Sequence, residues 1–211
     1  LFGMGPPSSG EILLRGEPVR FSSSKEAIAH GIGMVHQHFM LVESFTAAQN
    51  IVLGMEPKKG MFVNEAEAVQ FTKELSKKYN LEVDAEAVTR TLPVGVKQKI
   101  EILKALARGA EILILDEPTA VLAPQETDQL FEELIHLKEQ GHTIVFISHK
   151  IPEIKRISDR ITVMRASQSV GCYQTEDVTE KEISNLIMGC EMDTSIEKTE
   201  PKPGDLRIQV E

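Results

Sequence analysis

The sequence is poor in cysteine and in aromatic residues, and it has no long apolar run. Its 211 residues include two cysteines, two tyrosines and no tryptophan. Cys172 and Cys190 lack the paired spacing of a zinc site, and so few thiols are typical of a reduced cytosolic setting. No apolar run approaches the roughly 18 residues that a membrane-spanning helix needs. Any role at a membrane is therefore expected to depend on a partner protein.

Basic residues are also outnumbered. Lysine and arginine total 23 against 32 aspartates and glutamates, which gives a net charge of −9. A nucleic-acid-binding surface needs a basic face because the phosphate backbone is negative. The sequence therefore predicts no nucleic-acid partner. Its length and its 41% hydrophobic content suit one globular domain with at most a small appendage.

Helix and strand patterns alternate along the chain. Apolar spacing, turn residues and caps predict a hairpin at 10–21, a strand at 32–37, and helices at 24–31, 46–53, 64–80, 94–110 and 125–141. Continuous apolar runs predict strands at 112–116, 142–149 and 161–165, the first two buried on both faces. This alternation predicts an α/β fold with a parallel sheet and right-handed crossovers.

Polar groups follow two of these strands. The stretch ILILDEPTA places Asp116 and Glu117 at the end of one strand, and His149 follows the next. Ligands of parallel sheets lie beyond the carboxyl ends of the strands, so these side chains are predicted to share one site. The alternative is a surface turn with two solvated acids. Four aliphatic residues that drive the strand into the core, and Pro118 that ends it, disfavour that alternative.

A family resemblance is carried by the stretch LPVGVKQKIEILKALARGAEILILDEPTAVLAPQE, with VHQHF upstream and FISHK downstream. From Leu1 to about residue 190 the order and spacing resemble the nucleotide-binding subunit of an ATP-binding-cassette (ABC) transporter. GIGMVHQHFMLV and EPTAVLAPQE resemble the branch that serves sugar and nucleoside importers, in which one chain carries two cassettes.

The resemblance implies an architecture. It implies an α/β fold with a RecA-like P-loop NTPase core, an α-helical subdomain at about 61–110 and a small antiparallel β edge. Residues 1–190 would form a partial cassette. Residues 191–205 would be a linker, and 206–211 would begin a second cassette.

The resemblance also implies roles for single residues, with ATP and Mg²⁺ as cofactors. Asp116 would hold Mg²⁺ largely through water, and Gln37 would reach Mg²⁺ and relay the nucleotide state to a membrane partner. Glu117 would be the general base for the attacking water, and His149 would contact the γ-phosphate. His36 and His38 share a face at period two, but we expect no metal site there because no third ligand is visible.

The family signature, Leu-Ser-Gly-Gly-Gln, resembles LPVGV at 92–96, before a helix whose N-terminus would face the phosphate of the opposite subunit. Its nucleotide-binding residues would be Leu92, Pro93, Val94 and Gly95. Pro93 stands in place of the serine and removes a hydroxyl and a backbone donor, while Val96 replaces the glutamine. Ala123 stands where this branch often has threonine. These departures leave open whether the signature supports hydrolysis.

A phosphate loop, G-x-x-x-x-G-K-[ST], is expected ahead of Leu1, and we therefore expect an N-terminal truncation. The segment GPPSSGEI at 5–12 has the glycine spacing, but Glu11 stands where the lysine belongs, so it is predicted as a turn before a strand. A missing first strand would leave apolar side chains without neighbours and the chain poorly stable. The residues predicted to be affected are Ile112, Ile114, Val145 and Ile147.

The leading hypothesis is a fragment of the ATPase subunit of a sugar or nucleoside importer, located in the cytoplasm as a peripheral protein on the inner face of the cell membrane. Its partners would be membrane permease subunits, a second cassette in the same chain or in a dimer, and indirectly a solute-binding protein. The alternative is a degenerate, non-hydrolysing module that docks on a permease or a partner cassette. A soluble ABC protein of DNA repair or translation is disfavoured by the acidic charge.

Overall fold

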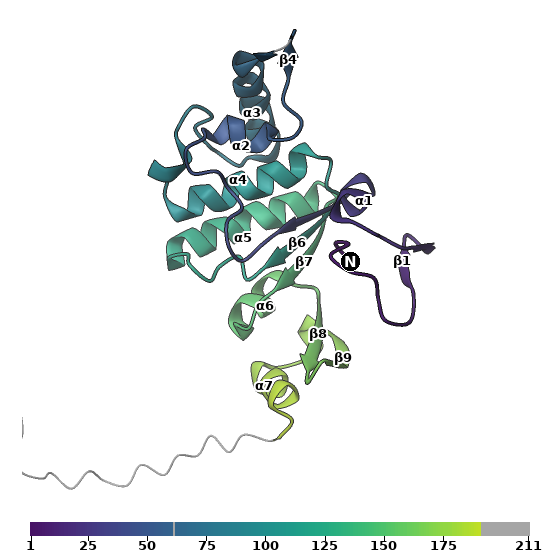
Figure 1. The fold of residues 1–211 in the computed structure, drawn as a ribbon. Helices are drawn as coiled ribbons and strands as arrows, with labels where there is room; N and C mark the ends of the chain where they lie inside the picture. The colour runs from purple at the N-terminus through teal and green to yellow at the C-terminus, as the bar shows by residue number, and fades with distance from the viewer. Residues whose placement is uncertain (61, 191–211) are drawn as a thin grey trace, which may run out of the picture. The chain divides into compact units, whose positions relative to one another are not determined.

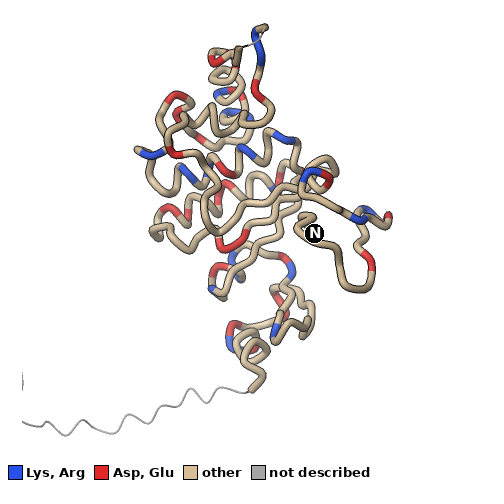
Figure 2. Tube along the Cα trace, in the orientation of Figure 1, with Lys and Arg blue, Asp and Glu red and all other residues tan. Residues whose placement is uncertain are grey.

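The computed structural model describes residues 1–60 and 62–190. The predicted linker at 191–205 and the predicted second cassette at 206–211 lie outside these residues. The chain forms two compact units, one from Leu1 to Ser158 and one that begins at Asp159. Within the described residues, no helix is both long enough and apolar enough to cross a bilayer. Acidic and basic residues are interspersed along the described trace (Figure 2).

A three-stranded parallel sheet with the order β3-β6-β7 lies in the first unit (Figure 1). Its strands are β3 (Ile32–Val35), β6 (Ile112–Asp116) and β7 (Thr143–Ile147). Helix α5 (Pro124–Glu139) connects β6 to β7, and Gly141 follows it with a positive φ of 95°. The register aligns Val35 with Leu115, and Leu115 with Phe146, so the three strands end at one edge of the sheet.

The central strand β6 is buried, whereas β7 lies at the edge of this sheet. Leu113 and Leu115 are fully buried between the paired strands, and Ile114 is also buried. Val145 and Ile147 are 39% and 44% exposed, so the prediction that β7 is buried on both faces is wrong. The prediction that Val145 and Ile147 lack neighbours is confirmed, while that for Ile112 and Ile114 is wrong. Ile114 packs with Phe21, Ala27 and Ile32, and Ile112 packs against this cluster.

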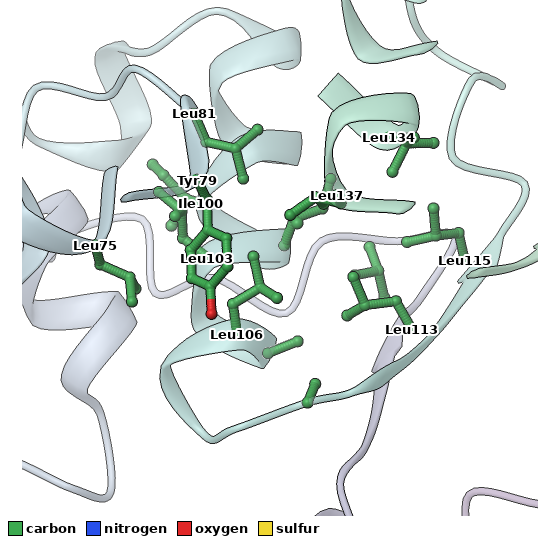
Figure 3. Packing of buried hydrophobic residues seen from close by; sticks show 14 of the residues in the cluster. Leu75, Tyr79, Leu81, Ile100, Leu103, Leu106, Leu113, Leu115, Leu134 and Leu137 are labelled. Atoms are coloured by element: carbon green, nitrogen blue, oxygen red, sulfur yellow. The ribbon is translucent and has the colours of Figure 1, made fainter. Parts of the chain in front are cut away.

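A helical layer packs on the sheet. It contains α2 (Ala47–Val52), α3 (Glu65–Tyr79), the 3-10 turn η1 (Thr89–Thr91) and α4 (Val94–Ala107), with the short strands β4 (Lys58–Lys59) and β5 (Phe62–Val63) beside it. Leu75 and Tyr79 of α3 meet Ile100 and Leu103 of α4 in the main core, which also receives Leu134 of α5 (Figure 3). These helices confirm the helices that the apolar spacing of the sequence predicted at 46–53, 64–80 and 94–110. Helix α2 packs on both α3 and α4.

The N-terminal segment forms the predicted hairpin, β1 (Ile12–Leu14) with β2 (Glu17–Val19). Its two turn residues, Arg15 and Gly16, both have positive φ, as a type I′ hairpin turn requires. Helix α1 (Ser24–Ala29) follows, capped by Ser23, whose side chain accepts from the Glu26 backbone N–H.

The second unit contains β8 (Arg160–Arg165), β9 (Gln168–Gln174), the 3-10 turn η2 (Thr175–Asp177) and α7 (Glu180–Met188), and the first unit ends with α6 (Ile151–Ile157). Strand β8 pairs antiparallel with β9 and not with the parallel sheet, so its prediction as a third core strand is wrong. Ala166 and Ser167 turn the chain with φ values of 48° and 62°. That turn sends the chain back along β8 and gives it a partner that the sequence analysis did not foresee.

Candidate functional site

The residues predicted to form the nucleotide site lie where the parallel strands end. Asp116 is the last residue of β6, and the register places it opposite Ile147. Glu117 follows it, Gln37 lies two residues beyond β3, and His149 lies two residues beyond β7. The fold therefore places the four side chains along one edge of the sheet, as expected for a site at the carboxyl ends of parallel strands.

Glu117 and His149 are in direct contact. His149 Nδ1 lies 2.7 Å from Glu117 Oε1, and because a carboxylate only accepts hydrogen bonds, the proton belongs to Nδ1. The Glu117 side chain is 18% exposed and the His149 side chain 75% exposed. Glu117 Oε2 is buried and has no hydrogen-bond partner in the described part of the chain. One oxygen of this carboxylate is thus oriented by the histidine, and the other is unoccupied.

The backbone at Glu117 is held in an unusual conformation. Its φ is 49°, in the left-handed region that non-glycine residues seldom adopt. The Glu117 N–H donates to the Ile147 carbonyl at 2.9 Å, one step beyond the last paired residues of β6 and β7. Strained backbone of this kind clusters at functional sites, where surrounding contacts hold it.

A network that the sequence analysis missed supports the two strand ends. Lys150 Nζ donates to the Thr119 carbonyl at 3.1 Å and to Glu153 Oε1 at 3.0 Å. The Thr119 hydroxyl donates to Glu153 Oε2 at 2.5 Å, and Thr119 is fully buried. The loop after Glu117 and the residue after His149 are thereby tied to each other. The Lys-x-x-Glu spacing of Lys150 and Glu153 at the start of α6 is the sequence pattern from which their ion pair could have been predicted.

The strand-tip residues fit the part of a nucleotide site that faces a metal ion and a water molecule. Mg²⁺ in such sites takes one or two carboxylates and keeps several waters. Asp116 is half-buried, and Oε2 of the next residue, Glu117, has no hydrogen-bond partner in the described part of the chain. The described residues contain no cluster of three His, Cys, Asp or Glu side chains able to hold a metal by themselves.

The segment 5–12 forms bends that lead into β1, as predicted.

The segment after β3, which carries Gln37, is attached to α4. The Met40 N–H donates to Glu101 Oε1 at 2.5 Å, and Lys104 Nζ donates to the Met40 carbonyl at 2.8 Å. Gln37 itself is exposed. Beside this segment lies a cavity of about 230 Å³, whose lining residues include Phe2, Met34, His36, Met40, Lys104 and Arg108.

A buried asparagine joins the same segment to the turn before α4. Asn50 is fully buried; its Oδ1 accepts from the Val42 N–H at 2.8 Å, and its amide donates to the Val42 carbonyl and to Thr89 Oγ1 at 3.0 and 2.9 Å. It also donates to the Thr46 carbonyl at 3.2 Å. Asn50 was given no role from the sequence, although it lies inside the predicted helix at 46–53.

The predicted signature residues lie at the beginning of α4. Leu92 packs against the main core, Pro93 is the N-cap, and Val94 is exposed in the first turn. The Gly95 N–H donates to Glu126 Oε1 at 3.2 Å. Among the described residues, no hydrogen bond or ion pair joins 92–96 to Asp116, Glu117 or His149. The predicted site residues therefore form two groups, one at the strand ends and one at the start of α4.

Comparisons with known proteins show what the chain is similar to. The family model described as ABC transporter matches residues 1–120. The chain is 41% identical over its whole length to the nucleoside import ATP-binding protein NupA of Lactococcus lactis subsp. cremoris. It is 44% identical over 97% of its length to the guanosine import ATP-binding protein NupO of Bacillus subtilis. It spans 42% and 40% of these two relatives, which is less than half of each.

Solved structures show the same fold. The structure of cbiO1 from Clostridium perfringens, part of the ABC transporter complex cbiONQ, matches with a TM-score of 0.70 and 28% identity over 89% of this chain and 76% of that one. An ATP-binding cassette of an ABC transporter, MJ1267, matches with a TM-score of 0.73 and 21% identity over the same shares of the two chains.

Proposed function

The chain belongs to the ABC transporter family, and we propose that it is part of the nucleotide-binding subunit of an importer for a sugar or a nucleoside. The relatives named above are import ATP-binding proteins for nucleosides and guanosine, and a further relative, MglA of Haemophilus influenzae, is named for galactose and methyl galactoside. Because the chain spans less than half of these proteins, the activity and the solute class of the whole protein belong to the proposal.

The proposed reaction is hydrolysis of ATP at the edge where β3, β6 and β7 end. Glu117 is the proposed general base, because its buried Oε2 has no protein partner and can take a proton from an attacking water. His149 holds the other oxygen and so fixes the orientation of the carboxylate. The exposed edge of the imidazole is free to meet a phosphate. This contact between Glu117 and His149 is the observation that carries the proposal.

Asp116 and Gln37 are the proposed holders of Mg²⁺, largely through water. Bound Mg²⁺ would neutralise charge on the phosphates. Asp116 presents its carboxylate at the end of a buried strand, where the backbone is fixed by pairing on both sides. Gln37 lies at the end of the neighbouring strand and adds an amide oxygen. The phosphates themselves need a backbone cradle, which we assign to a G-x-x-x-x-G-K-[ST] loop in the full protein.

Coupling to a membrane permease is proposed to run through the segment that carries Gln37. Glu101 and Lys104 of α4 hold Met40 of this segment, and Asn50 holds Val42 to Thr89. A change at Gln37 would thus reach the start of α4, where residues 92–95 are proposed to face the nucleotide of a second cassette. That cassette would lie in the same chain or in a dimer, with a solute-binding protein as an indirect partner. The subunit would be cytoplasmic and peripheral on the inner face of the membrane.

The second candidate is a non-hydrolysing cassette that docks on a permease or a partner cassette. Pro93 and Val96 favour it, since they remove polar groups from the start of α4. The two candidates share the fold and differ in turnover.

The experiment measures Mg-ATP binding by calorimetry to the 211-residue chain and to the full-length protein with a phosphate loop. Binding at micromolar concentrations by the full-length protein alone supports the proposed site. Steady hydrolysis by that protein, lost in Glu117→Gln, separates the ATPase from the non-hydrolysing cassette. Equal binding by the bare chain would place the main phosphate contacts on the residues described here, and would overturn our assignment of the cradle to a separate loop.

A further inference from the structure

Glu126 connects the first turn of α5 to the first turn of α4, and we propose that it is a positioning residue for the segment 92–96. The inference rests on the proposed function, in which this segment faces the nucleotide of a second cassette. Glu126 itself is not proposed to touch nucleotide. It would act through the backbone of Gly95.

The contact is made by both oxygens of one carboxylate. Glu126 Oε1 accepts from the Gly95 N–H at 3.2 Å, and Glu126 Oε2 accepts from the Ala123 N–H at 3.0 Å. The first bond joins two helices across 31 residues of sequence, and the second lies within the first turn of α5. A single side chain therefore sets the distance between the start of α4 and the loop before α5.

The absence of a side chain at Gly95 leaves room for the Glu126 carboxylate. A Cβ atom added at Gly95 would lie 2.8 Å from Glu126 Oε1 and 3.3 Å from its Cγ. Gly95 lies within α4 and has no positive φ, so its backbone conformation does not require glycine. From the sequence, Gly95 was expected to be one of the nucleotide-binding residues. In the structure, the Glu126 carboxylate is the group that approaches it.

Neither N-cap residue has a side chain that can cap its helix. Pro93, the N-cap of α4, has no donor or acceptor in its side chain, and Ala123, the N-cap of α5, has none either. The first N–H groups of a helix have no acceptor in the helical backbone and need one from a side chain or water. Glu126 supplies one to each helix, and its negative charge is favourable near both N-termini.

A cavity beside the Glu126–Gly95 hydrogen bond gives the Glu126 carboxylate room to move. A cavity of about 80 Å³ is lined by Gly95, Glu126, Gln98 and Glu133, among others. Gln98 Nε2 and Glu133 Oε2 are buried there without a hydrogen-bond partner in the described residues. Packing alone therefore does not force Glu126 against Gly95. The two hydrogen bonds hold Glu126 there, so loss of one carboxylate oxygen is expected to separate the start of α4 from the start of α5.

The expected consequence is a change in turnover without a change in nucleotide binding. The strand-tip group of Asp116, Glu117 and His149 has no hydrogen bond to Glu126 within the described residues. Removal of the joint would leave that group intact and would loosen only the segment proposed to complete the site of a second cassette.

The test uses the full-length protein with Glu126→Gln, Gly95→Ala, the double variant, and Glu132→Gln as a control on the exposed face of α5. Gln keeps the shape of Glu but has one oxygen, so it cannot accept from both Gly95 and Ala123. Ala at 95 displaces the carboxylate without altering it. Each single variant is expected to lower kcat about tenfold, and Glu126→Gln is expected to leave the binding of a fluorescent ATP analogue unchanged. The double variant is expected to be no worse than either single one.

Several outcomes would overturn the inference. If the wild type hydrolyses ATP and Glu126→Gln keeps full kcat, Glu126 has no positioning role. Additive losses in the double variant would show that Gly95 and Glu126 act separately, and an equal loss in Glu132→Gln would point to charge alone. If urea midpoints fall in proportion to kcat, the role is structural. A wild type that binds but never hydrolyses ATP would instead overturn the proposed ATPase, and with it this role.

Discussion

His149 Nδ1 lies 2.7 Å from Glu117 Oε1, so groups that follow two neighbouring strands are joined by one hydrogen bond. The other Glu117 oxygen is buried and has no partner in the described residues. A buried carboxylate oxygen without a partner is costly, because it has lost its hydration and gained nothing in return. In the reaction we propose, an attacking water would supply that missing partner.

Replacing Glu117 with Gln in the full-length protein is expected to abolish steady ATP hydrolysis while ATP binding is kept. The amide keeps the shape of the carboxylate but cannot take a proton, and general-base catalysis contributes about 10²- to 10⁴-fold. Phosphate release and nucleotide binding measured on the same preparation separate the two effects. Glu132→Gln serves as the control. Full turnover in Glu117→Gln would remove Glu117 from the role of base.

Asn50 is expected to be among the least replaceable polar residues of the helical layer. In Asn50→Leu, the Val42 N–H and carbonyl and the Thr89 hydroxyl would lose a buried partner. A buried polar group left without a partner costs about 1–3 kcal/mol. Urea unfolding is therefore expected to show a loss of at least about 2 kcal/mol for this variant.

Gln70→Leu is the matched control for that measurement, because it removes an exposed amide from α3. A substitution on an exposed helix face usually changes stability by less than about 0.5 kcal/mol. Equal losses in the two variants would show that the four hydrogen bonds of Asn50 add nothing measurable to the fold.

The strand-tip group could be predicted from the sequence, because each step depends on local pattern. Four aliphatic residues before Asp116 predict a buried strand, Pro118 ends it, and parallel strands bring their carboxyl ends to one edge. The partner of β8 could not be predicted in this way. Its hairpin turns at Ala166 and Ser167, which are not the residues that a positive φ favours.

The hydrogen bonds that join separate helices of the helical layer could not be predicted from the sequence either. The Asn50 contact with Thr89 spans 39 residues, and the Glu126 contact with Gly95 spans 31. Both depend on how separate helices pack, and no local period encodes that packing. Gly95 shows the consequence, because the glycine was foreseen but the group that approaches it was not.

The buried ion pair between α4 and α5 gives a third prediction. Lys99 Nζ lies 2.6 Å from Glu133 Oε1, and the two side chains are 11% and 6% exposed. Removal of one partner leaves the other charge buried, so Lys99→Met is expected to cost about 3–5 kcal/mol. The double variant Lys99→Met, Glu133→Leu is expected to recover most of that loss, because apolar side chains replace both charges. A double variant less stable than Lys99→Met would contradict this account.

Glu133 also predicts how stability changes with pH. Burial raises the pKa of its carboxyl above the ordinary value of 4.5, and the hydrogen bond and charge of Lys99 only partly oppose this. The folded chain then holds the proton more tightly than the unfolded chain. The contribution of Glu133 to stability is therefore fully present below pH 4.5 and is lost as the pH rises through the folded pKa.

Glu133→Gln is expected to remove that dependence. The difference in urea midpoint between Glu133→Gln and the wild type should grow in favour of the variant as the pH rises above 4.5. Glu82→Gln, with the same charge change on an exposed position that does not act on Glu133, is the control. A difference that shrinks with rising pH would mean that the pair with Lys99 outweighs burial.

The edge strand β7 gives the last prediction, which compares two aliphatic residues of equal size. Leu115 in β6 is fully buried, whereas Ile147 in β7 is 44% exposed. Leu115→Ala is expected to cost about 2–5 kcal/mol, the usual range for a large buried side chain. Ile147→Ala should cost less than half of that in the 211-residue chain, because much of its surface already meets water.

Urea unfolding at two protein concentrations measures the cost of each substitution. If the two costs are equal at low and high concentration, the exposed face of β7 is covered within a single chain, and our account of β7 as the edge of this sheet is wrong. If the cost of Ile147→Ala rises with concentration, a second copy covers that face.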